Sequence, residues 1–203
     1  MEVDLAIAWL RAAADSVAAS AGELTRLDAA IGDGDHGVNM SRGFTAVIAA
    51  LDAGTFDSVG DVFVKAGTTL ISKVGGASGP LYGSAFRALG KALPAGPSVT
   101  APELAAGLRA GLEAVRKLGK ADPGDATMVD AFQPAVDAFT GDDLAAAAEN
   151  AARAAEQGAR ATVDLRARKG RASYLGERSV GHQDPGATST ALIFRALNAV
   201  TAK

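Results

Sequence analysis

The sequence of 203 residues contains no cysteine, few aromatic residues and no excess of basic side chains. The absence of cysteine excludes disulfide bonds, thiolate nucleophiles, iron–sulfur clusters and cysteine-type zinc sites. Only 5% of the residues are aromatic although 48% are hydrophobic, so the core must consist mainly of Ala, Leu, Val and Ile, which suits close-packed helices. Lys and Arg number 20 against 23 Asp and Glu. This balance argues against a nucleic-acid-binding protein.

Long hydrophobic runs are also missing. Glu2 and Asp4 stand where an export signal would be basic, and Arg11 and Asp15 interrupt the apolar stretch that follows. The apolar residues of this stretch recur at helical spacing, which predicts an amphipathic helix and not a membrane span. We therefore expect a cytoplasmic protein without membrane contact.

Glycine clusters divide the chain into segments with helical patterns, and we find no strand pattern and no internal repeat. We expect residues 1–203 to form a single all-α domain. The patterns predict about eight helices: one through residues 3–17, one that closes with Val47–Leu51, one from about Val59 to Lys73, one after Pro80, one opened by a capping box at Thr100–Glu103, one capped by Asp125 that ends before Gly141, one from Asp142 to about Arg166, and one from about Ala187 to Val200.

The connections between these helices alternate in character. Three are short and plain, at residues 53–57, at 94–98 and at Gly141, whereas the other four contain the glycine clusters and most of the unusual polar residues. In an up-down antiparallel barrel or bundle, alternate connections lie at the same end. We therefore expect the four glycine-containing loops to converge on one rim and to form a single site there.

The first of these loops, residues 31–39, excludes two familiar motifs. Its glycines match G-x-G-x-x-G, but no strand precedes them, and an EF-hand starting at Asp33 would end at Phe44 where a glutamate is required. What remains is three carboxylates, with Asp28 on the turn before the loop and Asp33 and Asp35 on one side of an extended stretch. Three clustered negative charges are unfavourable without a cation, and carboxylate ligands favour Mg²⁺. The alternative is that Asp and Gly are simply common turn residues.

The other three loops each have a functional and a plain structural interpretation. Residues 75–80 precede a helix whose first N–H groups could bind a phosphate, with Ser78 as a cap or a phosphate donor, or they form only a tight turn. Residues 124–128 start a helix, and Met128 with Gly119 could line an apolar slot for a base. Residues 166–186 form a long cationic loop that suits a lid over phosphates, although Asp184 could be only a helix cap.

Taken together, these loops resemble the nucleotide-binding L subunit of dihydroxyacetone kinase, and the resemblance covers nearly the whole chain. The matching stretches are residues 32–39, 75–83, 124–128 and 168–188, and the last of these is specific to the family. The resemblance implies an eight-helix antiparallel barrel that binds ADP or ATP at one rim. It also implies a phosphoryl-transfer reaction, in which catalysis consists mainly of positioning and charge stabilisation.

The resemblance assigns a role to individual residues. Asp28, Asp33 and Asp35 would hold two Mg²⁺ ions that bridge the nucleotide phosphates, and Arg171 would be the catalytic residue. The residues that contact the nucleotide would be His36, Gly37, Val38, Asn39, Ala77 and Ser78 at the phosphates or ribose, Gly119, Thr127 and Met128 around the adenine, and Arg171, Asp184, Pro185 and Gly186 closing over it.

The resemblance also implies partners. Dihydroxyacetone would be held by a separate K subunit, so the chain would be an inactive kinase subunit by itself. The bound ADP would be recharged by a phosphohistidine protein of the phosphoenolpyruvate-dependent phosphotransferase system, which the form of the 168–188 loop favours. Two alternatives stay open: an ATP-dependent kinase with exchanging nucleotide, and a nucleotide-sensing module that binds a transcriptional regulator.

Overall fold

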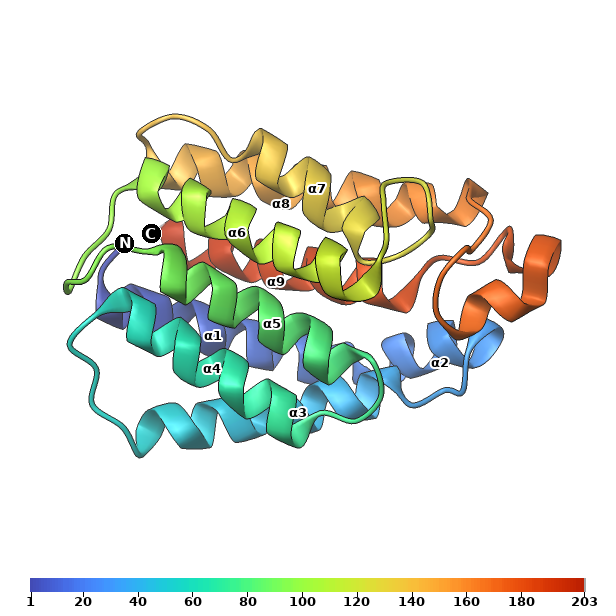
Figure 1. Ribbon diagram of the computed structural model, residues 1–203, viewed down its shortest axis with the longest axis horizontal. Helices are drawn as coiled ribbons and strands as arrows, with labels where there is room; N and C mark the ends of the chain where they lie inside the picture. The colour runs from blue at the N-terminus through green and yellow to red at the C-terminus, as the bar shows by residue number, and fades with distance from the viewer. Residues whose placement is uncertain (203) are drawn as a thin grey trace.

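The computed structural model describes residues 1–202, and the regular secondary structure of this part of the chain is helical, with no named strand. The predicted all-α class is therefore confirmed. Nine α-helices and two 3-10 helices follow one another along the described residues (Figure 1): α1 (Val3–Ala19), α2 (Ala21–Ile31), α3 (His36–Asp52), α4 (Val59–Lys73), α5 (Ser78–Ala92), α6 (Ala101–Gly119), α7 (Val129–Ala138), α8 (Leu144–Ala161), η1 (Thr162–Asp164), η2 (Arg171–Ser179) and α9 (Pro185–Thr201).

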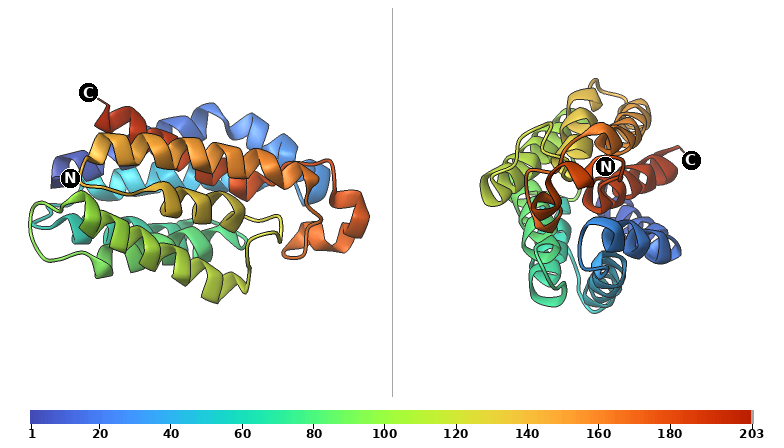
Figure 2. Two further views of the ribbon diagram at one scale, coloured as in Figure 1. Left: turned by 90° about the horizontal axis from the view of Figure 1, so that it is seen from above. Right: turned by 90° about the vertical axis from the view of Figure 1, so that its right-hand side faces the viewer.

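Eight of the α-helices form a closed antiparallel barrel. From α3 to α9 each helix packs against its neighbours in the chain, and α1 closes the ring by packing against both α3 and α9. The end-on view in Figure 2 shows these helices surrounding a common interior. The predicted eight-helix barrel is confirmed, with α2 as an additional helix that packs on α3 and α9.

The sequence prediction missed α2 because it follows α1 almost without a break. Ser20 alone separates the two helices, and its backbone leaves the helical conformation at φ −100° and ψ 5°. The chain therefore changes direction after α1, and α2 projects beyond the barrel wall (Figure 1). Of its residues, Leu24, Asp28 and Ile31 are buried. This helix places Asp28 at the rim of the barrel.

Two predicted boundaries of α8 were also wrong. The helix begins at Leu144 and not at Asp142, because Asp143 caps it: the Asp143 carboxylate accepts hydrogen bonds from the N–H groups of Ala145 and Ala146. It ends at Ala161 and not near Arg166. Thr162, fully buried, donates its hydroxyl to the Ala159 carbonyl and accepts from the backbone N–H of Asp184, so the chain is fixed to the start of α9 at this point.

Glycine residues let several helices approach very closely. A Cβ atom added to Gly60 on α4 would lie 2.6 Å from the Gly90 carbonyl oxygen on α5, and one added to Gly158 on α8 would lie 2.1 Å from the Asp130 carbonyl oxygen on α7. Trp9 and Phe63 pack edge to face inside the barrel, 5.4 Å between ring centroids. Alanine and glycine thus give the close packing that the low aromatic content requires.

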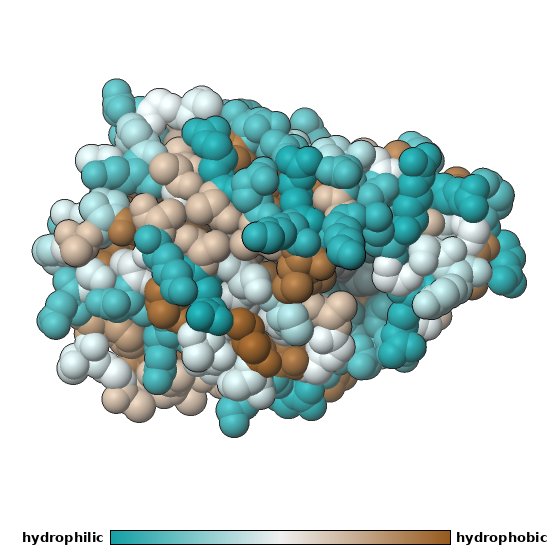
Figure 3. Space-filling model, in the orientation of Figure 1, coloured by the Kyte–Doolittle hydropathy of each residue, from teal (hydrophilic) through white to brown (hydrophobic). Residues whose placement is uncertain are grey.

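The four glycine-containing loops lie at one end of the barrel, as predicted. Figure 1 shows them on the right, with α2 and η2, whereas both termini and the three plain loops lie on the left. On the face seen in Figure 3, apolar side chains are interspersed with hydrophilic ones. Within residues 1–202, no helix has the length and apolar character needed to cross a membrane.

Candidate functional site

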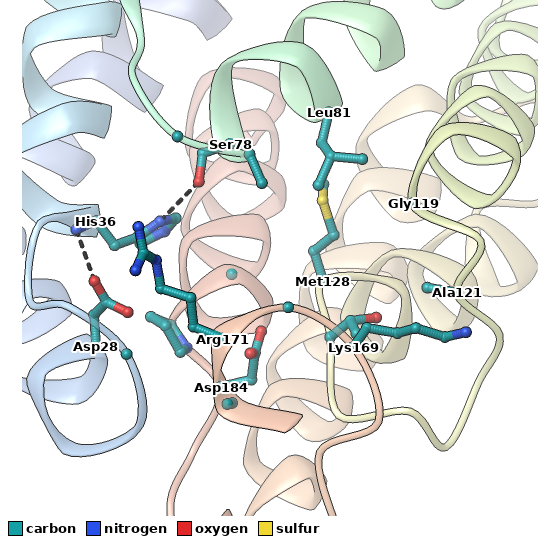
Figure 4. A pocket seen from close by; sticks show the side chains of 18 of the residues that line it. Asp28, His36, Ser78, Leu81, Gly119, Ala121, Met128, Lys169, Arg171 and Asp184 are labelled. Carbon is teal, nitrogen blue, oxygen red and sulfur yellow. Dashed lines mark hydrogen bonds between the residues drawn. The ribbon is translucent and has the colours of Figure 1, made fainter. Parts of the chain in front are cut away.

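A cleft of about 300 Å³ opens at the rim where the four loops meet (Figure 4). Its wall is built from the end of α2, the starts of α3, α5 and α9, the end of α6 and the segments before α7 and η2. Most of the predicted site residues line it: Asp28, Asp33, Asp35, His36, Ala77, Ser78, Gly119, Thr127, Met128, Arg171, Asp184, Pro185 and Gly186.

Three carboxylates form an acidic cluster on one side of the cleft. Asp28, Asp33 and Asp35 each offer an oxygen atom, and these atoms lie within 4.8 Å of one another. Asp28 does not lie on a turn, as the sequence suggested, but near the end of α2, where it is only 9% exposed. Its Oδ2 atom accepts hydrogen bonds from the backbone N–H groups of Asp35, at 2.9 Å, and His36, at 3.1 Å.

The donor set of this acidic cluster fits a hard divalent cation. Carboxylate oxygens are the ligands that Mg²⁺ prefers, and their mutual repulsion falls when a cation lies between them. A Cβ atom at Gly32 would lie 2.1 Å from Asp28 Oδ1, so only glycine lets the loop fold this closely over the carboxylate. Asp28, Asp33 and Asp35 could therefore hold Mg²⁺.

His36 lies beneath the cleft at the start of α3. Its Nδ1 atom is 3.0 Å from Ser78 Oγ and its Nε2 atom is 2.8 Å from Ser189 Oγ. Burial lowers the pKa of His36 below its ordinary value, against the opposing influence of Asp28, Asp35 and a hydrogen bond with the Pro185 backbone. This favours a neutral imidazole.

The start of α5 presents backbone N–H groups to the cleft. Ala77 occupies the cap position and provides no side-chain cap, so the first-turn N–H groups lack a side-chain acceptor there. Gly76 has φ +66°, and nothing lies within 4 Å of a Cβ atom added to it. The helix dipole adds a partial positive charge. A phosphate group could thus approach this helix end closely.

The opposite wall of the cleft is apolar. Figure 4 shows the side chains of Leu81 and Met128 pointing toward each other, and Val115 and Gly119 on α6 lie along the same wall. The sequence analysis missed Leu81 and Val115, although both continue the apolar faces of α5 and α6 toward the rim. The apolar slot along this wall suits a flat apolar group such as a base.

The segment before α7 differs from its prediction. Asp125 does not cap α7, which begins at Val129, because Ala126 has φ +55° and interrupts the helical path. Asp130 accepts hydrogen bonds from the backbone N–H groups of Gly124 and Thr127. Asp125 instead accepts from the Asp122 N–H at 3.0 Å and lies 3.9 Å from Lys169 Nζ.

Residues 165–184 extend over the acidic side of the cleft. Arg171 at the start of η2 forms an ion pair with Asp33, with 2.9 Å between Nη2 and Oδ2. Both ends of the segment are anchored, since Arg168 N–H donates to the Asp125 carbonyl and Gly181 N–H donates to the Val163 carbonyl. Arg171 was predicted to contact phosphates, and here its partner is a carboxylate of the acidic cluster.

Asp184 lines the cleft and also caps α9, so the helix-cap role considered in the sequence analysis is present. Its Oδ2 atom accepts a hydrogen bond from Ala187 N–H at 2.7 Å. Burial raises the pKa of Asp184 to about 7, and repulsion by Asp130 and Asp28 acts in the same direction. Carboxylates with a raised pKa are common in functional clefts.

Three predicted nucleotide-binding residues are not among those that line the cleft in the described chain. Gly37 packs against α2, where an added Cβ atom would lie 2.0 Å from the Ala21 carbonyl oxygen. Val38 is 59% exposed, and Asn39 accepts a hydrogen bond from Arg42 at 2.8 Å. The helical twist turns Gly37 and Val38 away from the cleft once α3 has begun at His36, whereas the Asn39 side chain lies beside Gly75 at the cleft margin.

The fold and the cleft define an all-helical barrel protein with a rim site that combines carboxylates, a helix N-terminus and an apolar slot. The chain belongs to the DAK2 domain family, which matches residues 30–199.

Similar proteins support this membership. The chain is 46% identical to the ADP-binding subunit DhaL of PEP-dependent dihydroxyacetone kinase 1 of Listeria innocua, over 96% of this chain and 94% of that protein. It is 44% identical to the ADP-binding subunit DhaL of the PTS-dependent dihydroxyacetone kinase of Lactococcus lactis, over the full length of both. The crystal structure of the dihydroxyacetone kinase of C. freundii in complex with AMP-PNP and Mg²⁺ superimposes with a TM-score of 0.73 at 28% identity, over 97% of this chain and 34% of that chain.

Proposed function

We propose that residues 1–203 are the nucleotide-binding L subunit of a dihydroxyacetone kinase. The subunit binds ADP or ATP with Mg²⁺ in the rim cleft, and its nucleotide delivers a phosphoryl group to dihydroxyacetone held on a separate K subunit. A phosphohistidine protein supplied by phosphoenolpyruvate restores the phosphate. The observation that carries the proposal is the union, in one cleft, of the acidic cluster, the open N-terminus of α5 and the apolar slot.

The dimensions and chemistry of the cleft suit a nucleoside diphosphate. The adenine fits the slot between Leu81 and Met128, and the phosphates extend toward the backbone N–H groups at Ala77 and Ser78. Asp28 and the other two carboxylates hold one or two Mg²⁺ ions, which neutralise charge on the transferring phosphoryl group. The open side of the cleft is left for the K subunit.

Arg171 changes partner in this proposal. In the structure it pairs with Asp33. When Asp33 turns to a cation, the guanidinium is free to form charge-assisted hydrogen bonds to the phosphates. Arg171 then stabilises negative charge during phosphoryl transfer and keeps the 165–184 segment over the nucleotide.

The lengths and names of the similar proteins favour phosphoenolpyruvate as the phosphate source. The relatives of nearly equal length are named as PEP-dependent or PTS-dependent ADP-binding subunits. By contrast, the L-erythrulose kinase of Pectobacterium atrosepticum, 41% identical, contains the matching region as only 34% of its length. Exchanging ATP remains the second candidate donor.

Reconstitution of the reaction tests the proposal. The purified chain with ATP, Mg²⁺ and dihydroxyacetone should form no dihydroxyacetone phosphate. Addition of a K subunit, a phosphohistidine carrier and phosphoenolpyruvate should start turnover at substoichiometric ADP. Turnover by the chain alone would contradict the need for a partner, and no turnover in the complete mixture would contradict the kinase assignment.

Native mass spectrometry separates the two phosphate sources. If ADP stays bound like a prosthetic group, the purified protein should carry one ADP with its Mg²⁺. An empty protein that needs stoichiometric ATP for turnover would establish the exchanging alternative.

A further inference from the structure

An arginine and an asparagine on α3 connect this helix to the turn that precedes α5. The Arg42 guanidinium donates hydrogen bonds from Nη2 to Asn39 Oδ1, at 2.8 Å, and from Nε to the Lys73 carbonyl, at 3.3 Å. Lys73 is the last residue of α4, and residues 74–77 lead from it to the start of α5. A guanidinium is favourable beside the last carbonyl groups of a helix, because the helix dipole is negative there. Arg42 therefore fixes Asn39 relative to this turn.

The turn itself is packed closely on α3. A Cβ atom added to Gly43 would lie 2.0 Å from Val74 Cγ2, and Val74 is buried. A Cβ atom added to Gly75, which lines the cleft, would lie 3.4 Å from Asn39 Oδ1, 3.6 Å from Asn39 Nδ2 and 3.5 Å from Arg42 Nη2. The Asn39 amide thus lies at the cleft margin, beside the segment that leads to the open N-terminus of α5.

The bond to Arg42 determines which end of the Asn39 amide is left for a ligand. A guanidinium only donates hydrogen bonds, so the amide oxygen must face it, and Nδ2 keeps two N–H donors. Asn39 is 7% exposed, and within residues 1–202 no hydrogen bond from its Nδ2 atom is found. These N–H groups therefore remain for an acceptor at the cleft margin.

Arg42 forms no ion pair within residues 1–202, so both of its hydrogen bonds go to neutral acceptors. Without this guanidinium the Asn39 amide could turn by about 180° and present its oxygen, which repels an anion. We propose that Arg42 is a positioning residue for nucleotide binding, because it holds the Asn39 amide with its N–H groups toward the phosphate at the start of α5. The sequence analysis assigned no role to Arg42. This inference rests on the proposed nucleotide function, because the phosphate belongs to that ligand.

Calorimetry with ADP and Mg²⁺ measures what each side chain contributes. Arg42→Met keeps an unbranched stem without donors, and ADP affinity should fall about two- to tenfold, as expected when one side chain must be ordered on binding. Asn39→Ala removes hydrogen bonds to a charged group and should weaken binding roughly ten- to a hundredfold. Arg42 is exposed, so its replacement should hardly change the Tm of the empty protein. Arg153→Met is the matched control with unchanged ADP affinity, because Arg153 donates to Asn150 at the same spacing on α8, outside the cleft.

A double-mutant cycle separates positioning from the charge of Arg42. If Arg42 acts through Asn39, Arg42→Met should cause a clearly smaller loss of ADP affinity in an Asn39→Ala background than in the wild type. A guanidinium that acted only by its charge would cause the same loss in both backgrounds. Equal losses would therefore overturn the inference while leaving the nucleotide function intact.

The Asn39 amide can also be observed directly in the wild-type protein. The chain contains three asparagines, Asn39, Asn150 and Asn198, so ¹⁵N-asparagine labelling gives three side-chain amide groups, and Asn39→Ala assigns the first. ADP with Mg²⁺ should move an Asn39 Nδ2 proton downfield and slow its exchange with water, and Arg42→Met should reduce both effects. Asn39 signals that do not respond in a protein that binds ADP would overturn the inference. Wild-type protein that binds no ADP would overturn the proposed function and this inference with it.

Discussion

The guanidinium of Arg171 and the carboxylate of Asp33 form an ion pair at 2.9 Å that joins the 165–184 segment to the acidic cluster. Both side chains reach solvent, with 70% of the Arg171 and 38% of the Asp33 side chain exposed. Exposed pairs of this kind contribute only about 0.2–1 kcal/mol to stability. The contact can therefore be exchanged for stronger ones to phosphate without a large loss of folding free energy.

Replacement of Arg171 should affect the ligand and not the fold. We expect Arg171→Ala to weaken nucleotide binding roughly ten- to a hundredfold, because hydrogen bonds to charged groups contribute about 1.5–3 kcal/mol. The Tm of the empty protein should hardly change. Calorimetry with ADP and Mg²⁺ measures the first effect, and Arg166→Ala, which removes the exposed pair with Glu177 on the same segment, is the control.

Nucleotide should also protect this segment from proteolysis. We expect trypsin to cut between Arg166 and Arg178 in the empty protein, since the pairs at Arg171 and Arg166 are exposed. Added ADP with Mg²⁺ should slow this cleavage, because phosphate contacts hold the segment closed. Equal rates in the two states, followed by gel and mass spectrometry, would show that the segment is not a lid.

Asp33→Ala should greatly weaken ADP binding in the presence of Mg²⁺. The variant removes one of three carboxylates whose oxygens lie within 4.8 Å and which share the charge of the cation. In wild-type protein EDTA should lower the Tm of the ADP-bound form, and this effect should be lost in the variant. Unchanged affinity would mean that the carboxylate only belongs to a turn. Asp142→Ala, far from the cleft, is the control.

The stability of the metal-free protein should depend on the ionisation of Asp184. Its pKa is raised from 3.8 to about 7, so the folded state binds this proton more tightly than the unfolded state. The contribution of this group to the free energy of unfolding is therefore fully present below about pH 4, and it is lost as the pH rises toward 7. Asp184→Asn keeps an effective helix cap and should raise the free energy of unfolding at pH 8 by a few kcal/mol, on the order of the pKa shift.

Urea unfolding with EDTA at pH 4.5 and pH 8 measures this difference. The variant and the wild type should differ far less at the lower pH, where the aspartate is protonated in the folded protein. An equal difference at both values would show that Asp184 is not held protonated by its surroundings.

Two glycine substitutions with opposite expected effects on stability test the helix packing. Gly158→Ala would place a Cβ atom 2.1 Å from the Asp130 carbonyl oxygen, and overpacking of this kind costs about 1–3 kcal/mol, more than the gain in helix propensity. Gly22→Ala on α2 meets nothing within 4 Å and should stabilise the protein by about 0.5–1 kcal/mol. A stabilising Gly158→Ala, measured by urea unfolding, would contradict the close contact of α7 and α8.

The sequence by itself determined those features that depend on near neighbours in the chain. The capping box of Thr100 and Glu103 is present, and α4 has the predicted bounds of Val59 and Lys73. Helical periodicity and capping act over a few residues, so they can be read locally. The alternation of plain and glycine-containing loops also placed the site at one rim, because an antiparallel barrel leaves little freedom in how its ends are used.

Only the tertiary structure decided which side chains meet across the barrel. The sequence shows Tyr82, Ser189 and His36 on separate helices, and nothing local indicates that they form one hydrogen-bonded chain. Likewise Asp184 has a pKa of about 7 because three-dimensional packing buries it near other carboxylates, and Arg171 has a partner in Asp33 because a distant segment folds over the rim. Burial and electrostatic interaction depend on distance in space, which the order of residues does not contain.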